Sequence, residues 1–96
     1  MELTDINRFL EDFEHVVNMD SASGNNDGIL KLAHFFQERF SRLGMACGIQ
    51  LPGNGTVPCL KATLGDPPHD MMFLGHMDTV FPEGEAALRP FAIHGN

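Results

Sequence analysis

Apolar residues recur at helical spacing in the first half of the chain. One such stripe lies between Thr4 and Val17 and consists of Ile6, Phe9, Leu10, Phe13, Val16 and Val17. A second lies between Gly28 and Leu43 and consists of Ile29, Leu32, Ala33, Phe36, Phe40 and Leu43. Side chains spaced three and four residues apart share one face of an α-helix. The pattern therefore predicts two amphipathic helices joined by a polar loop.

The predicted helix ends carry residues suited to capping. Thr4 or Asp5 is expected to cap the first helix, and Asn26 or Asp27 the second, because their side-chain oxygens accept hydrogen bonds from free backbone N–H groups. Gly44 follows the second stripe directly and is expected to stop that helix in a left-handed conformation.

The pattern changes in the second half, where short apolar runs alternate with turn residues. Residues 45–51 and 56–64 predict two strands, each followed by a turn rich in Gly and Pro. Pro58 favours an edge position or a late start for the second of these. The compact run 71–74 predicts a central strand buried on both faces, and a further strand is expected to begin near residues 91–96.

This order of elements predicts an α/β fold in which two N-terminal helices pack on a partial β-sheet. The chain has 96 residues, 43% of them hydrophobic and 20% charged, which is the composition of one globular domain over residues 1–96. No apolar run approaches the roughly 18 residues of a membrane span.

The net charge of the chain limits the classes of partner that it is expected to bind. The formal net charge is −7, so the surface is expected to repel phosphate backbones and anionic lipids. Nucleic-acid and membrane partners are therefore not expected. The acidic N-terminus has no basic and apolar leader, so the expected location is the cytoplasm. Cys47 and Cys59 are interpreted as reduced thiols.

The candidate chemistry lies directly after the third predicted strand, at His76 and Asp78. Residues i and i+2 of an extended chain project to the same side, so the two side chains are expected to adjoin. A carboxylate beside an imidazole can orient that ring as a metal ligand. Gly75 is expected to allow a close backbone approach. The tripeptide alone is a weak signal, and the alternative is a solvated surface turn.

The surrounding residues strengthen the metal interpretation. Residues 72–82, MFLGHMDTVFP, resemble the first metal-binding motif of the M20 metallopeptidase family, which includes glutamate carboxypeptidases, acetylornithine deacetylase and succinyl-diaminopimelate desuccinylase. Residues 20–25, DSASGN, and 89–96, RPFAIHGN, are similar to other parts of the N-terminal portion of these enzymes. The TVFP and RPF segments favour the glutamate carboxypeptidase-like branch.

This resemblance implies that His76 is a zinc ligand and that Asp78 is the catalytic carboxylate beside it. It implies a centre of two zinc ions acting on a small peptide or an N-acyl amino acid, with the remaining ligands supplied by residues beyond Asn96. One His and one Asp do not complete a zinc site. We therefore expect residues 1–96 to be an N-terminal fragment of a zinc-dependent amide hydrolase, inactive alone.

The alternative is a non-catalytic scaffold or assembly module. A partial sheet leaves strand edges unpaired, and such edges are templates for pairing with another chain. A homo-oligomer is therefore expected. The other histidines, His15, His34, His69 and His94, are interpreted as surface or boundary residues, because their spacing suggests no shared site.

Overall fold

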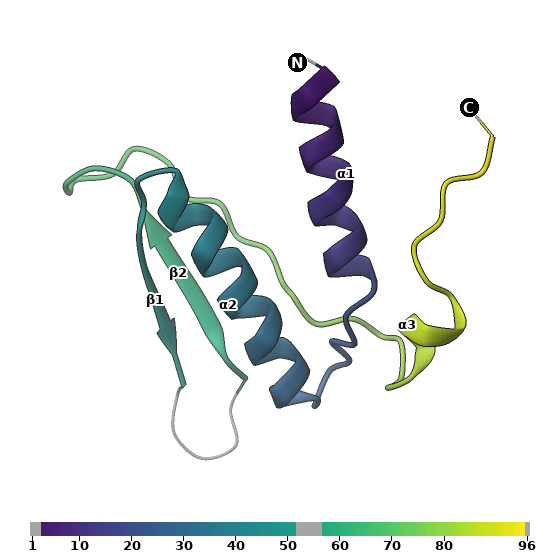
Figure 1. Ribbon diagram of the computed structural model, residues 1–96. Helices are drawn as coiled ribbons and strands as arrows, with labels where there is room; N and C mark the ends of the chain where they lie inside the picture. Colours follow the sequence, from purple (N-terminus) through teal and green to yellow (C-terminus); the bar gives the residue numbers. More distant parts are fainter. Residues whose placement is uncertain (1–2, 52–56, 96) are drawn as a thin grey trace.

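The computed structural model describes residues 3–51 and 57–95 and has the small α/β fold that the sequence predicts (Figure 1). Its elements in chain order are α1 (Leu3–Val17), α2 (Asn26–Arg42), β1 (Ala46–Gln50), β2 (Cys59–Thr63) and α3 (Glu85–Leu88). None of the helices in the described part of the chain is long and apolar enough to cross a membrane.

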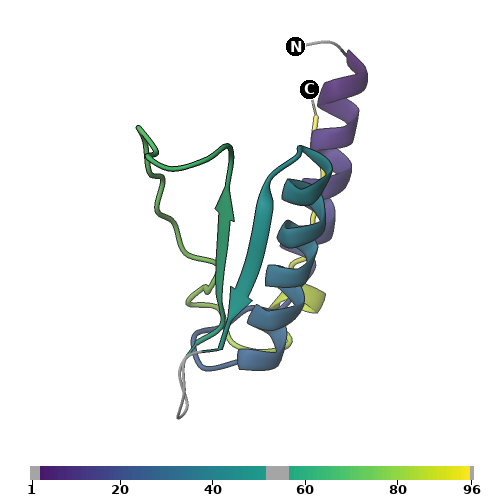
Figure 2. The same cartoon turned by 90° about the vertical axis from the view of Figure 1, so that its left-hand side faces the viewer.

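The strands β1 and β2 form an antiparallel pair in which Ala46 faces Thr63 and Gln50 faces Cys59. Pro58 immediately precedes β2, which confirms the late strand start. The predicted start at Thr56 lies outside the described residues. Figure 2 shows this hairpin against one side of α2, and α2 contacts both strands. Both thiols are free, with Cys59 exposed.

The helix α2 begins earlier than predicted and has a different cap. Asn25 is the capping residue, and its side chain accepts a hydrogen bond from the backbone N of Gly28 at 3.1 Å. The predicted caps, Asn26 and Asp27, instead lie inside the first turn. At the other end Gly44 has a φ of 85°, which confirms the left-handed stop. The first helix already includes Leu3, so Thr4 and Asp5 lie within its first turn rather than capping it.

The core is small and is centred on α2. Its buried hydrophobic residues are Ile29, Leu32 and Ala33. The helix α1 contacts α2 through Arg39, which forms two 3.0 Å hydrogen bonds to the carboxylate of Asp12, and through the ring of His15, which stacks on Phe35. The apolar stripe of α1 is left partly uncovered, and Phe9 is 57% exposed.

The predicted central strand at residues 71–74 is wrong. The segment forms no strand, and Met71, Met72, Phe73 and Leu74 are 77%, 80%, 89% and 85% exposed. Within the described residues β1 and β2 pair with each other, and no strand adjoins this run. A strand needs a neighbour to take up its backbone hydrogen bonds, and an apolar run alone does not supply one. Residues 91–95 likewise form no strand.

The molecule is thin and expanded for its length. Its radius of gyration is 15.2 Å, against about 12.5 Å for a compact chain of this size. Its accessible surface is 7714 Å², against about 5500 Å² for a compact monomer of the same mass. Exposed apolar side chains, such as those of residues 71–74, contribute to this excess.

Candidate functional site

The loop between α1 and α2 holds the segment that carries His76 and Asp78. A single parallel bridge links Ala22 to Thr79. The backbone N of Thr79 donates to the carbonyl oxygen of Ser21 at 2.7 Å, and the backbone N of Ser23 donates to the carbonyl oxygen of Thr79 at 2.9 Å. These bonds join residues more than fifty positions apart and place the candidate site beside the start of α2.

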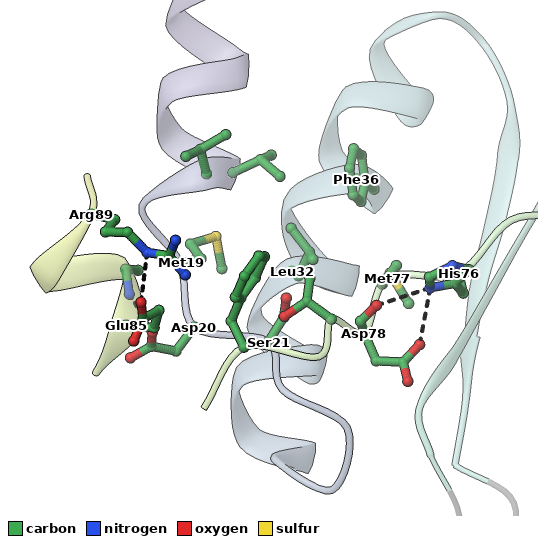
Figure 3. A pocket seen from close by; sticks show the side chains of 15 residues that line it. Met19, Asp20, Ser21, Leu32, Phe36, His76, Met77, Asp78, Glu85 and Arg89 are labelled. Carbon is green, nitrogen blue, oxygen red and sulfur yellow. Dashed lines mark hydrogen bonds and ion pairs between the residues drawn. The ribbon is translucent and has the colours of Figure 1, made fainter. Parts of the chain in front are cut away.

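The side chains of His76 and Asp78 adjoin, as the sequence predicts (Figure 3). The Nδ1 atom of His76 lies 2.9 Å from the carbonyl oxygen of Asp78 and 3.3 Å from its Oδ1. A carbonyl oxygen and an ionised carboxylate can only accept hydrogen bonds, so Nδ1 carries the proton. In the neutral ring the lone pair is then on Nε2, which is the atom available to a ligand.

The pair occupies an exposed position rather than the tip of a buried strand. The His76 side chain is 82% exposed and that of Asp78 is 35% exposed. A β-carbon on Gly75 would meet no atom within 4 Å, so the expected close backbone approach at this glycine is wrong. Within the described residues, the imidazole is oriented by its contacts with Asp78, and the segment that carries it belongs to no strand.

Asp78 has a second partner that the sequence did not reveal. Ser23 donates its hydroxyl proton to Oδ2 of Asp78 at 2.5 Å. This hydrogen bond is the main cause that lowers the pKa of Asp78 below its ordinary value, and His76 acts in the same direction. The sequence places Ser23 in the polar loop between the two helices, and no local signal connects it to a carboxylate 55 residues later.

The side chains that could bind zinc can be compared with the zinc centre that the sequence analysis expects. Across residues 3–51 and 57–95, no group of three or more His, Cys, Asp or Glu side chains is placed to hold a metal ion. A catalytic zinc takes three protein ligands and a water. The described residues thus fit one ligand, Nε2 of His76, with its orienting carboxylate, and they do not complete the centre.

Three of the other histidines have different surroundings. The ring of His15 stacks on Phe35 with 4.8 Å between centroids, Nδ1 of His34 faces Gln37, and Nε2 of His69 lies 3.1 Å from the carbonyl oxygen of Gly65. The partners recorded for these three rings are Phe35, Gln37 and Gly65 rather than His76.

A groove of about 520 Å³ adjoins the pair, between the helices and residues 76–79. Figure 3 shows His76 and Asp78 on one side of it and the Arg89–Glu85 pair on the other. Its lining is largely apolar and includes Val16, Val17, Met19, Leu32, Phe36 and Met77. Such a groove suits the apolar part of a small molecule more than a charged one.

The far side of this groove is fixed by Asp20. Its carboxylate accepts hydrogen bonds from the backbone N of Gly84 at 3.1 Å and of Ala86 at 3.3 Å. Arg89 pairs with Glu85 at 2.6 Å and lies over the ring of Phe81 at 5.0 Å. The same loop, residues 20–23, therefore positions both sides of the groove.

One curated protein supports the hydrolase interpretation. The chain is 26% identical over 93 residues to Carboxypeptidase G2 of Pseudomonas sp. (strain RS-16), a match that covers 91% of this chain and 21% of that protein. The chain thus spans about a fifth of the length of this relative. No family model matches the chain. No solved structure matches it significantly.

Proposed function

We propose that residues 1–96 are the N-terminal part of the catalytic domain of a zinc-dependent amide hydrolase of the carboxypeptidase type, similar to the M20 family. In this proposal His76 is a zinc ligand and Asp78 is the carboxylate that orients it. The observation that carries the proposal is the contact of Nδ1 of His76 with the backbone carbonyl oxygen of Asp78 at 2.9 Å and with its Oδ1 at 3.3 Å, which leaves Nε2 as the atom that can face a metal. The similarity to a carboxypeptidase supports it.

Zinc, when bound in such a centre, polarises the scissile carbonyl and activates a water molecule. The part of this chain is to hold the imidazole in the tautomer that presents Nε2, with Asp78 accepting a hydrogen bond from the Nδ1–H group. A small peptide or an N-acyl amino acid is the proposed substrate class. Since a catalytic zinc needs more ligands than this pair provides, the chain alone is proposed to be inactive.

The test uses the protein expressed from its native coding sequence, with the same protein carrying His76→Ala beside it. Hydrolysis of a panel of N-acyl amino acids and dipeptides is measured with added zinc and after chelation. The proposal predicts zinc-dependent release of an amino acid that is lost after chelation and in the variant. Hydrolysis that is unaffected by His76→Ala or by chelation, or no hydrolysis of any member of the panel, contradicts it.

A specific observation favours a second candidate function, an assembly module. The accessible surface of 7714 Å² exceeds that of a compact monomer by about 2200 Å², more than the roughly 800 Å² that each partner buries in a standard interface. The extended run 71–74 has the backbone and the apolar side chains to pair as a strand. We propose that in the isolated chain a second copy covers this run.

A further inference from the structure

We infer that Ser23 is a positioning residue for His76, acting through Asp78. The importance of this role rests on the proposed function, since an oriented imidazole matters most if it binds a metal. The geometry itself is independent of any metal. Three groups from two distant parts of the chain stand in one line of contacts, from the Ser23 hydroxyl to the Asp78 carboxylate and on to the His76 ring.

The Asp78 carboxylate has two oxygens, and each has its own partner. Oδ2 accepts from Ser23 at 2.5 Å, and Oδ1 lies 3.3 Å from Nδ1 of His76. The Asp78 side chain is 35% exposed, so without Ser23 water can solvate Oδ2 and the carboxylate can rotate about its Cβ–Cγ bond. The hydroxyl therefore holds the plane of the carboxylate so that one oxygen stays towards the imidazole, whose Nδ1 also lies 2.9 Å from the backbone carbonyl oxygen of Asp78.

Ser23 is well anchored for this task. Its backbone N donates to the carbonyl oxygen of Thr79, the residue after Asp78, at 2.9 Å. The adjoining turn is closed by a 2.8 Å bond from the backbone N of Asn25 to the carbonyl oxygen of Ala22. The serine hydroxyl is thus held against the same stretch of backbone that carries the carboxylate, which reduces the entropy lost in forming the contact.

The order of the three groups differs from that of a Ser-His-Asp triad. In such a triad the histidine stands at the serine hydroxyl and the carboxylate lies behind the histidine. Here the carboxylate stands in the middle, and Ser23 donates to it while His76 lies on its other side. The hydroxyl proton is engaged in orienting Asp78.

The test reads the tautomer of His76 directly. The 96-residue chain is labelled with ¹⁵N, and the Nδ1 and Nε2 shifts are recorded by NMR at a pH of about 8.5, where an ordinary imidazole is neutral. The wild-type chain is expected to hold mainly the Nδ1–H form. Ser23→Ala is expected to lower the ratio of Nδ1–H to Nε2–H by about threefold, the effect of weakening one modest hydrogen bond.

Ser23→Thr keeps the hydroxyl and is expected to restore the wild-type ratio. Ser41→Ala, at an exposed serine of α2, is the matched control and is expected to leave the ratio unchanged. A wild-type chain that holds mainly the Nε2–H form overturns the inference without any variant. So does a folded Ser23→Ala chain with an unchanged ratio.

These outcomes are separate from those of the proposed function, because no metal is present in the measurement. A tautomer that responds to Ser23 in a protein without zinc-dependent hydrolysis leaves this inference standing and removes the proposed function. If the protein shows zinc-dependent hydrolysis but the tautomer ratio of His76 is unchanged in Ser23→Ala, the proposed function stands and this inference is overturned.

Discussion

A β-carbon on Gly28 would lie 2.1 Å from the backbone carbonyl oxygen of Asp20. This close approach presses the loop that precedes α2 against the first turn of that helix. The same loop, residues 20–23, pairs with Thr79 and carries Ser23. The glycine therefore sets the position of the loop that holds the candidate site.

Gly28→Ala is expected to destabilise the fold. Alanine is the better helix former by about 1 kcal/mol, so propensity alone predicts the opposite sign. The clash is with backbone, which cannot move aside as a flexible side chain can, and we expect a net loss of about 2 kcal/mol in the free energy of unfolding. Urea denaturation measures this loss.

Gly48→Ala is the control for that change, because its β-carbon would meet no atom within 4 Å. We expect its unfolding free energy to stay within about 0.5 kcal/mol of wild type. Equal effects of the two substitutions would show that Gly28 is not held against Asp20.

The Asp12–Arg39 pair is expected to make stability depend on pH. The hydrogen bond from Arg39 is the main cause that lowers the pKa of Asp12. A carboxyl whose folded pKa is lowered stabilises the fold above its unfolded pKa of about 3.9, and that contribution is lost as pH falls through the lowered folded value.

Asp12→Asn should therefore lower the urea midpoint at pH 7, and the difference from wild type should close as pH falls below about 4. Asp70→Asn, at an exposed aspartate of the 64–70 turn region, is the matched control and should change the midpoint little at either pH. If the urea midpoint of wild type exceeds that of Asp12→Asn by the same amount at pH 7 and at pH 2.5, the role given to this ion pair is contradicted.

The exposed run 71–74 is expected to drive self-association of the isolated chain. Phe73→Lys places a charge on the most exposed of its side chains, 89% exposed, and should weaken pairing with a second copy because like charges then face each other. Light scattering over a range of concentrations should show dimers or larger species for wild type and a shift towards monomer for the variant.

Leu88→Lys is the matched control, since Leu88 is 77% exposed in α3 and lies outside the run. It should associate as wild type does. A wild-type chain that remains monomeric at high concentration removes the assembly proposal.

Asp78→Ala is expected to weaken zinc binding by the 96-residue chain by about tenfold, the usual effect of losing the carboxylate behind a histidine ligand. The affinity is measured by following the His76 resonances during a zinc titration. Asp70→Ala removes an exposed carboxylate that precedes the same segment and should leave the affinity unchanged. Equal affinities of wild type and Asp78→Ala would show that the carboxylate of Asp78 does not orient the ring.

The sequence predicted the features that depend on local spacing. The two helices follow from apolar positions on one face, and the contact of His76 with Asp78 follows from their separation by one residue. The strand predicted at residues 71–74 failed because its apolar pattern reports a tendency to be buried, while pairing depends on a neighbour that the described residues do not supply.

Ser23 was missed for a related reason. Its contact with Asp78 spans 55 residues and depends on the folded path of the loop between α1 and α2. The capping residue of α2 was predicted one or two positions too late, at Asn26 or Asp27, because Asn25, Asn26 and Asp27 are all suitable caps and only the backbone geometry chooses among them.

A zinc titration of ¹⁵N-labelled chain, observed at both ring nitrogens of His76, tests the central claim most directly. We predict that zinc shifts Nε2 of His76 first and most strongly, while Nδ1 keeps its proton and His34 and His69 respond only at higher zinc. Coordination through Nδ1, or a response at His76 no stronger than at those two histidines, would contradict the account.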